Sequence, residues 1–532
     1  MRRPRLDLVR TIRLAVAGAW RRSLADADEG ARWAVRSCAG TLALVSVAIA
    51  QPAVGQRSLA IEPNVSVTQT LTDNFRLTAV NPASDSITRL TAGVGLRSQA
   101  GLLRGYLDYS LSSVIYARHS ASNAFQNSLS SNLTADLLDG RATVVVEARI
   151  SQSAVSAFGA QPGSSGLSNA NSTELRTLRI TPSFRGPLGP DLRYSGSLGY
   201  SLSDASKTSK GDSSASTATL RLEPAAPGRL SWAVDGSHVK SDYKLGRTTE
   251  SDRANAHLNL RLDELDLQLN ANAGVELTDL ASSQRQRYPT WGYGAVWAPS
   301  VRIRLAAEID HRFFGKSHRL SLEYRTPLTV WRLSDSRRLN MGDGQSGIGG
   351  RGTQFDLYFA LFESEEPDKG KREELVNLFL RNKGIDPAAL VSPNFLRSAA
   401  TLEDRQELSV AWQGVRSSAA LALTRTHTRR LDSVVSAADD LAGSNEVRLD
   451  GISVTLAHRL TPESSLSLAL SEKQGQGKLA SQDNRQRQFN LVYNTRLTSE
   501  SNLVVGGRRA VYSTSRVPYA ESAIFASYGI RY

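Results

Sequence analysis

The residues that decide the fold are the last twelve, Glu521–Tyr532, which read ESAIFASYGIRY. Alternation of apolar and polar residues with period two predicts a β-strand with one apolar face. A strand that stays apolar to its last residue suits a sheet that closes on itself, because closure pairs the first and last strands and leaves no edge. The apolar set of alternate residues is Ser522, Ile524, Ala526, Tyr528, Ile530 and Tyr532.

The same alternation recurs along most of the chain, for example over 90–96, 129–137, 142–150 and 301–309. The segments run about 9–13 residues, which is the length that a tilted strand needs to cross a bilayer. Strands in soluble sheets are shorter, about 5–6 residues. The pattern therefore predicts an all-β fold, a large closed antiparallel transmembrane β-barrel of about 20–24 strands, with 22 as the best estimate.

The predicted connections fall into two kinds. Some are tight, such as Leu138-Asp139-Gly140 and Gly414-Val415, and others are long and rich in Ser, Asn, Asp and Gly, such as 153–172 and 431–445. Short turns at one rim and long loops at the other are typical of outer-membrane barrels. The last strand also resembles the C-terminal assembly strand of these barrels, with Tyr528, Ile530 and Tyr532 as its signature residues.

The N-terminal region is predicted to be a basic leader and secretory signal peptide, residues 1–50. It holds nine arginines and four acids, and the thirteen residues 38–50 carry no charge. Ala48 and Ala50 give the small-residue pattern that precedes a cleavage site, so we expect cleavage between Ala50 and Gln51. The only cysteine, Cys38, lies in this segment, which suits export to an oxidising compartment. The mature domain is then the barrel, residues 51–532.

Residues 363–396 interrupt the strand pattern and predict a short helical insertion. Leu375, Leu378 and Phe379 recur at helical spacing, with Gly384 placed as a C-cap. Asp386 and Pro387 could open a second short helix. The insertion is either a plug inside the barrel or a helical excursion at its rim, and we favour the rim because the segment is too short to close so wide a lumen.

The sequence contains no persuasive catalytic, cofactor or metal site. The seven histidines lack the spacing of metal ligands, and no Gly-x-Ser-x-Gly elbow follows a strand. The glycine-rich stretch 342–352 lacks the lysine and helix of a phosphate loop, so it is interpreted as a loop. Basic residues are mixed with acids despite a net charge of +13, which argues against nucleic-acid binding.

In several segments one set of alternate residues, called here one parity of the strand, is polar, and this polar parity is predicted to line a water-filled lumen. Charged residues are scarce on the opposite parity, where hydrocarbon would make them costly. Mixed signs indicate weak selectivity between cations and anions. The candidate lumen-lining residues are Glu147, Arg149, Asn255, His257, Asn259, Arg261, Arg302, Arg304, Glu308, Asp310 and Arg312.

Several short stretches, taken in order, resemble one family, the outer-membrane β-barrels associated with PEP-CTERM/exosortase systems of Gram-negative bacteria. They are Pro63–Thr68 with Thr72–Asn74, Tyr106–Leu111, Ile150–Gln152 with Phe158-Gly159, and Asn377–Phe379 with Gly384 and Phe395-Leu396. The resemblance implies a bacterial outer-membrane barrel encoded with exopolysaccharide genes, and it supplies no catalytic residues.

The leading hypothesis is a non-enzymatic, porin-like channel or accessory component for exopolysaccharide export, without cofactors. Its expected partners are outer-membrane lipid, the barrel-assembly machinery, exopolysaccharide and export proteins. A structural or adhesive barrel is the first alternative, and a barrel hydrolase with its site at the loop rim is the second.

Overall fold

The computed structural model describes residues 59–98, 101–160, 169–341, 353–362, 365–366, 368–383, 385, 387, 391, 395–431, 439–515 and 517–531. The predicted leader, its cleavage residues Ala48, Ala50 and Gln51, the glycine-rich stretch 342–352 and Tyr532 lie outside these residues.

The strands are β1 Leu59–Thr72, β2 Asp85–Ser98, β3 Leu103–Tyr116, β4 Ala124–Leu137, β5 Ala142–Ala154, β6 Ser172–Leu188, β7 Leu192–Ala205, β8 Ser213–Pro224, β9 Leu230–Tyr243, β10 Thr249–Leu262, β11 Leu267–Thr278, β12 Gln286–Ser300, β13 Ile303–Arg312, β14 Gly315–Arg325, β15 Thr329–Asn340, β16 Thr401–Gln413, β17 Ser417–Arg430, β18 Glu446–Arg459, β19 Ser464–Gln476, β20 Asn484–Arg496, β21 Ser501–Thr514 and β22 Tyr519–Arg531. The α-helices are α3 Gln354–Leu361, α4 Lys369–Lys383 and α5 Asp440–Ser444, and the short 3₁₀ helices are η1 Ser120–Ser122, η2 Asp263–Leu265 and η4 Ala480–Gln482.

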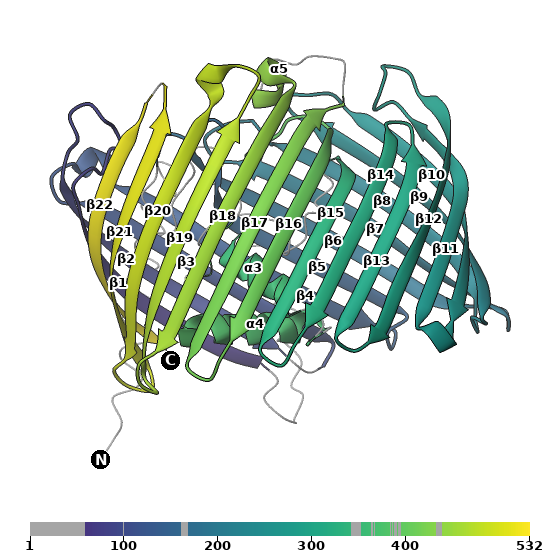
Figure 1. Ribbon diagram of the computed structural model, residues 1–532, viewed down its shortest axis with the longest axis horizontal. Coiled ribbons are helices and arrows are strands. Elements are labelled where there is room, and N and C mark those ends of the chain that lie inside the picture. The colour runs from purple at the N-terminus through teal and green to yellow at the C-terminus, as the bar shows by residue number, and fades with distance from the viewer. Residues whose placement is uncertain are drawn as a thin grey trace. The chain divides into compact units, whose positions relative to one another are not determined.

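The strands form one 22-stranded antiparallel sheet in which each strand pairs with its sequence neighbours. The sheet closes where β1 pairs with β22, in a register that runs from Asn64 opposite Arg531 to Thr72 opposite Ala523. Figure 1 shows the tilted strands wrapping around a common interior. The prediction of a closed antiparallel barrel with 22 strands is confirmed.

Alternate residues of each strand face opposite sides of the wall. On β22, Ile524 is 63% exposed and Tyr528 is 43% exposed. Glu521, which belongs to the other set of alternate residues of the same strand, is only 2% exposed. The register carries the outward parity from strand to strand, from Tyr528 to Val67 and on to Leu90. Large apolar side chains exposed on the outside of a closed sheet are the signature of a lipid-facing wall.

The two rims differ as the sequence predicts. One rim, called here the short-turn end, holds tight connections such as 138–141 and 414–416. The other, called the long-loop end, holds longer connections such as 155–171 and 431–445. Left-handed Leu138, Asp139 and Gly140 make the tight turn between β4 and β5 possible.

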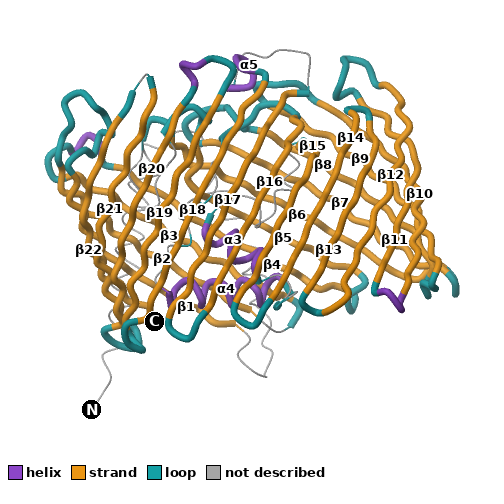
Figure 2. The backbone as a smooth tube through the Cα atoms, viewed as in Figure 1, coloured by secondary structure: helices purple, strands orange, loops and turns teal. Residues whose placement is uncertain are grey.

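The helical insertion differs from its prediction in start and in place. Its first helix, α3, begins at Gln354, before the predicted start at residue 363. The favoured rim position is wrong: Gln354 donates from Nε2 to Thr455 Oγ1 on the inward face of β18 at 2.7 Å. Figure 2 shows α3 and α4 enclosed by the strands. Pro387 lies in a turn, and Gly384 and Asp386, proposed as cap residues, lie outside the described residues.

Candidate functional site

The lumen is the candidate site, and its wall carries the residues that the sequence assigns to it. The cross-strand register places the candidates of β5, β10 and β13 on the parity opposite the exposed apolar side chains, whereas Arg302 lies exposed in the turn before β13. Several have polar partners: His257 contacts Asp235, and Asp310 accepts from Asn272 Nδ2 at 2.9 Å. The wall is therefore a network of paired charges and amides.

Sequence reasoning missed a central member of this network, Glu276 on β11. Its side chain is fully buried, and it accepts from Arg312 Nε at 3.0 Å and from Ser251 Oγ at 3.0 Å. The inward parity of β11 could have revealed it, since Glu276 shares that parity with Asn270 and Asn272.

Helix α3 is capped at its N-terminus and tied to the lumen wall at its C-terminus. Its N-terminus has a capping box, in which Thr353 and Asp356 exchange side-chain and backbone hydrogen bonds. At its C-terminus, Arg332 Nη1 donates to the carbonyl of Ala360 and Arg325 Nη2 to that of Leu361, both at 2.8 Å. Two arginines of β14 and β15 thus satisfy carbonyls that a helix end leaves without partners.

Helix α4 contributes two buried charged residues, Arg372 and Glu373, which are 5% and 3% exposed. The Arg372 guanidinium lies 4.5 Å from the Phe359 ring of α3. Glu373 shares a hydrogen bond with Tyr106 of β3. Burial raises the pKa of Glu373 to about 8, and nearby Asp108 adds to the rise, whereas Tyr106 and neighbouring arginines oppose it. The carboxyl is therefore largely protonated at neutral pH.

Small inward residues of the wall make room for the two helices. Ala420 and Ala422 of β17 and Ala457 of β18 pack in one buried cluster with helix side chains that include Leu357, Tyr358, Phe359, Leu361, Val376 and Leu380. These positions have the parity that carries Arg, Glu and Asn elsewhere in the barrel. The absence of charged residues from this part of the inward face indicates, from the sequence alone, that an apolar segment packs against it inside the barrel.

A second layer, called here the loop cap, lies at the long-loop end. It consists of 155–160, 395–400 and 439–445. Asp440 Oδ2 accepts from the backbone of Ala157 at 2.6 Å, and Asp439 Oδ2 accepts from that of Ser398 at 2.7 Å. The backbone carbonyl of Phe158 accepts a hydrogen bond of 2.8 Å from the hydroxyl of Tyr512 on the distant strand β21. Segments from three separate connections are thus tied together.

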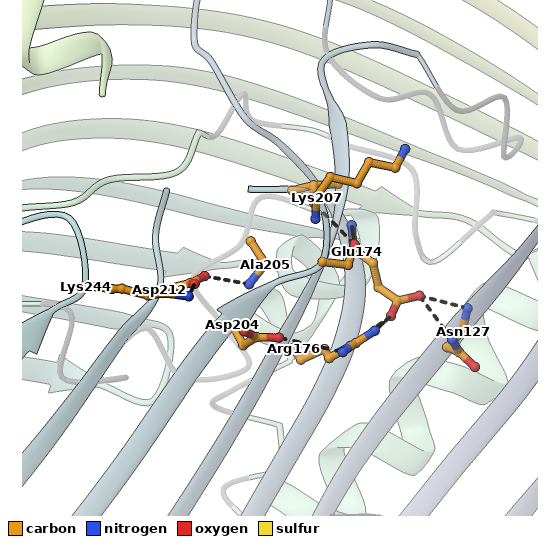
Figure 3. A network of polar contacts seen from close by, with 10 residues as sticks. Asn127, Glu174, Arg176, Asp204, Ala205, Lys207, Asp212 and Lys244 are labelled. Atoms are coloured by element: carbon orange, nitrogen blue, oxygen red, sulfur yellow. Dashed lines mark hydrogen bonds and ion pairs between the residues drawn. The ribbon is translucent and has the colours of Figure 1, made fainter. Parts of the chain in front are cut away.

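The outward parity also carries charge near the long-loop end, which corrects the expectation that such residues are scarce. In Figure 3, Glu174 of β6 accepts from Arg176 Nη2 at 2.9 Å and from the backbone of Asn127 on β4 at 3.1 Å. Arg176 also lies 3.7 Å from Asp204 of β7. Most of these outward charges are paired and lie within a few residues of the strand ends.

The described residues present no arrangement that is ready for catalysis. Ser417 Oγ lies 2.8 Å from His458 Nδ1, but the structure pairs no carboxylate with that ring. Other histidines pair with carboxylates, as His119 does with Asp85 at 2.7 Å. No group of three potential metal ligands is found in this part of the chain, and no helix there is long and apolar enough to cross a bilayer.

Comparison with known proteins gives similarity at the level of the fold only. No family model and no curated protein matches the sequence. The FrpB iron transporter from Neisseria meningitidis is similar with a TM-score of 0.47 and 8% identity over 88% of this chain and 81% of that one. The siderophore receptor PirA from Pseudomonas aeruginosa gives 0.43 and 10% over 90% and 81%. The outer membrane protein opdK from Pseudomonas aeruginosa gives 0.34 and 8% over 89% and 99%.

The assignment to a membrane rests on this chain's own wall. A closed barrel pairs the backbone groups of its strands with one another rather than with lipid, and most of its outward parity in the middle of the strands is apolar. Trp297, Trp331 and Trp412 lie on the outward parity near the short-turn end, as expected for side chains at a membrane interface. The protein is a barrel of the bacterial outer membrane.

Proposed function

We propose that this outer-membrane barrel is a gated component for exopolysaccharide export, working in a PEP-CTERM/exosortase-type system. The observation that carries the proposal is the pair of helices held inside a polar lumen by contacts with side chains of the wall. Each of these contacts can be broken without breaking the barrel's own hydrogen-bond ladder. A helix pair held in this way is suited to move aside while the wall stays intact.

The chemistry of the lumen supports a sugar polymer as the cargo. Asn255, Asn259, Asn270 and Asn272 lie on the inward parity of neighbouring strands β10 and β11. Amides both donate and accept hydrogen bonds, so sugar hydroxyls can exchange partners along such a wall. The barrel-assembly machinery, for folding, and export proteins, for delivery of the polymer, are the partners that this role requires.

The test is conductance in planar bilayers with and without residues 353–400. The deletion is feasible because Asn340 and Thr401, at the two ends of the connection that holds the insertion, are paired neighbours on β15 and β16, and residues 341–352 remain to join them. We expect the full chain to conduct weakly and the deletion variant to give a several-fold larger current that the cognate polysaccharide blocks. The control replaces the turn 225–228, at the opposite rim from the insertion's attachment, with Gly and Ser.

Two results would count against export. One is a deletion variant whose current equals that of the full chain, and the other is a current that the polymer leaves unchanged. Loss of biofilm cohesion with normal permeability after gene deletion would support the adhesive alternative instead.

A further inference from the structure

The outer wall of β17–β20 carries two carboxylates that are each held by two arginines. Asp450 of β18 accepts from Arg425 Nε at 2.9 Å and from Arg448 Nε at 3.0 Å. Glu472 of β19 accepts from Arg487 Nε at 2.8 Å and lies 3.1 Å from Arg485 Nε. We call these six residues the outer arginine patch. Four guanidinium groups against two carboxylates leave it with a net positive charge.

The patch lies on the lipid-facing parity and directly borders the apolar wall. Two residues further toward the short-turn end, each of the four strands places a large apolar side chain on the same face: Leu423, Ile452, Leu470 and Phe489. Ile452, Leu470 and Phe489 are exposed. The Arg425 and Arg487 side chains are 57% and 61% exposed. A cationic surface therefore meets a hydrocarbon-facing surface along one line.

The arginines keep unused hydrogen-bond donors. Each of the four contacts its carboxylate through Nε, and the described part of the chain supplies no acceptor for their terminal Nη groups. Paired Nη donors fit the oxygens of a phosphate group. Strands lie about 4.8 Å apart, so the patch extends about 14 Å from β17 to β20. That width accommodates two phosphate groups of one molecule.

We propose that the outer arginine patch binds the phosphate groups of an acylated glycolipid in the outer leaflet, with its acyl chains lying along Leu423, Ile452, Leu470 and Phe489. Charges on the outer wall are tolerated near the bilayer interface and not at its centre, which sets the patch at headgroup depth. A phosphorylated amphiphile matches both surfaces, whereas a free phosphate would match only the arginines.

The test measures lipid binding to the detergent-solubilised full-length protein by native mass spectrometry. The probes are hexa-acylated lipid A with two phosphates and the same lipid after both phosphates are removed. We expect the phosphorylated form to bind more tightly. Loss of charge-assisted hydrogen bonds in R425Q/R448Q or in R485Q/R487Q should weaken its binding about tenfold.

The matched control is R193Q/R221Q, which removes two arginines that also hold one carboxylate, Glu223, through Nε at 2.8 and 2.9 Å, but on the lumen face. It should leave lipid binding unchanged. If the glutamine variants fail to fold, R485K/R487K keeps the charge while losing the paired donors, and it should bind the lipid more weakly than the wild type.

Equal binding of the two lipids, or equal affinities of the wild type and the glutamine variants, would overturn the proposal. Displacement of the phosphorylated lipid by an equal concentration of inorganic pyrophosphate would instead make the patch a site for soluble anions. None of these three results depends on whether the lumen exports a polymer.

Discussion

At the scale of single residues, the wall is most constrained where two backbones come close. Gly105 on β3 has φ of +129°, which L side chains rarely adopt. A Cβ atom at this position would lie 1.9 Å from the carbonyl oxygen of Asn132 on β4. The alternating pattern places Gly105 on the outward face of its strand. It gives no sign of the backbone conformation of Gly105, because that conformation depends on a residue of the next strand.

Replacing Gly105 with alanine should therefore destabilise the barrel. The strained backbone costs about 1–3 kcal/mol, to which the steric clash with Asn132 adds. The measurement is the temperature at which the compact form converts to the unfolded form on a heat-modifiability gel. Gly199→Ala is the control, because the nearest neighbour of its added Cβ is at an ordinary contact distance of 3.6 Å. Equal midpoints for the two variants would contradict this view of Gly105.

A buried ion pair next to the closing seam provides a second prediction. Arg508 of β21 and Glu521 of β22 are 3% and 2% exposed, and Thr72 of β1 also donates to Glu521 at 2.8 Å. Glu521→Ala leaves Arg508 buried without its carboxylate, which should cost about 3–5 kcal/mol. Denaturant titration would measure the loss. The double variant R508M/E521M should recover most of it, and a failure to recover would show that the ion pair itself is required.

At the scale of elements, the packing of α4 against β3 should depend on pH through Glu373. This carboxyl has a pKa of about 8 when buried, against an ordinary value of 4.5 for a glutamate side chain. Between these values the packed state holds a proton that the unpacked state has released, so its stability is greatest below pH 4.5 and falls as pH rises toward 8. The measurement is hydrogen exchange of α4, corrected for intrinsic rates, between about pH 5 and about pH 9.

Glu373→Gln should remove this pH dependence, since a neutral amide cannot ionise. Glu374→Gln is the control, because Glu374 is the exposed neighbour on the same helix. If exchange in α4 changes equally with pH in the wild type and in E373Q, then another group controls the packing. Asp108, Tyr106, Arg97 and Arg149 are the ionisable groups that act on Glu373, and they are the next to test.

The existence of a helical insertion was predictable, but its position was not. Periodicity within 363–396 reports a local structure, whereas the contact between Gln354 and Thr455 joins residues that are far apart in sequence. The apolar face of the insertion needed a partner, and only the small inward side chains Ala420, Ala422 and Ala457 indicated where it was. Their meaning is clear once the inward parity of β17 and β18 is known.

At the scale of the whole molecule, alternation was enough to predict the barrel, its strand number and its two unlike rims. Period two assigns each residue to one side of the wall, and a closed sheet then has a single outside. Alternation does not report how deep a residue lies in the membrane. For this reason the outward charges Arg425, Asp450 and Glu472 were not anticipated, although their positions near strand ends are consistent with the interface.

The pairing of β1 with β22 has a consequence for biogenesis. Its contacts join the most distant parts of the described chain, such as Thr68 and Ser527, whose hydroxyls lie 2.8 Å apart. Such contacts carry the largest loop-closure entropy and form slowly. Until they form, the nascent sheet has two unpaired edge strands, and strands of other chains can pair with them. The time between secretion of β1 and arrival of β22 is therefore when a periplasmic chaperone matters most.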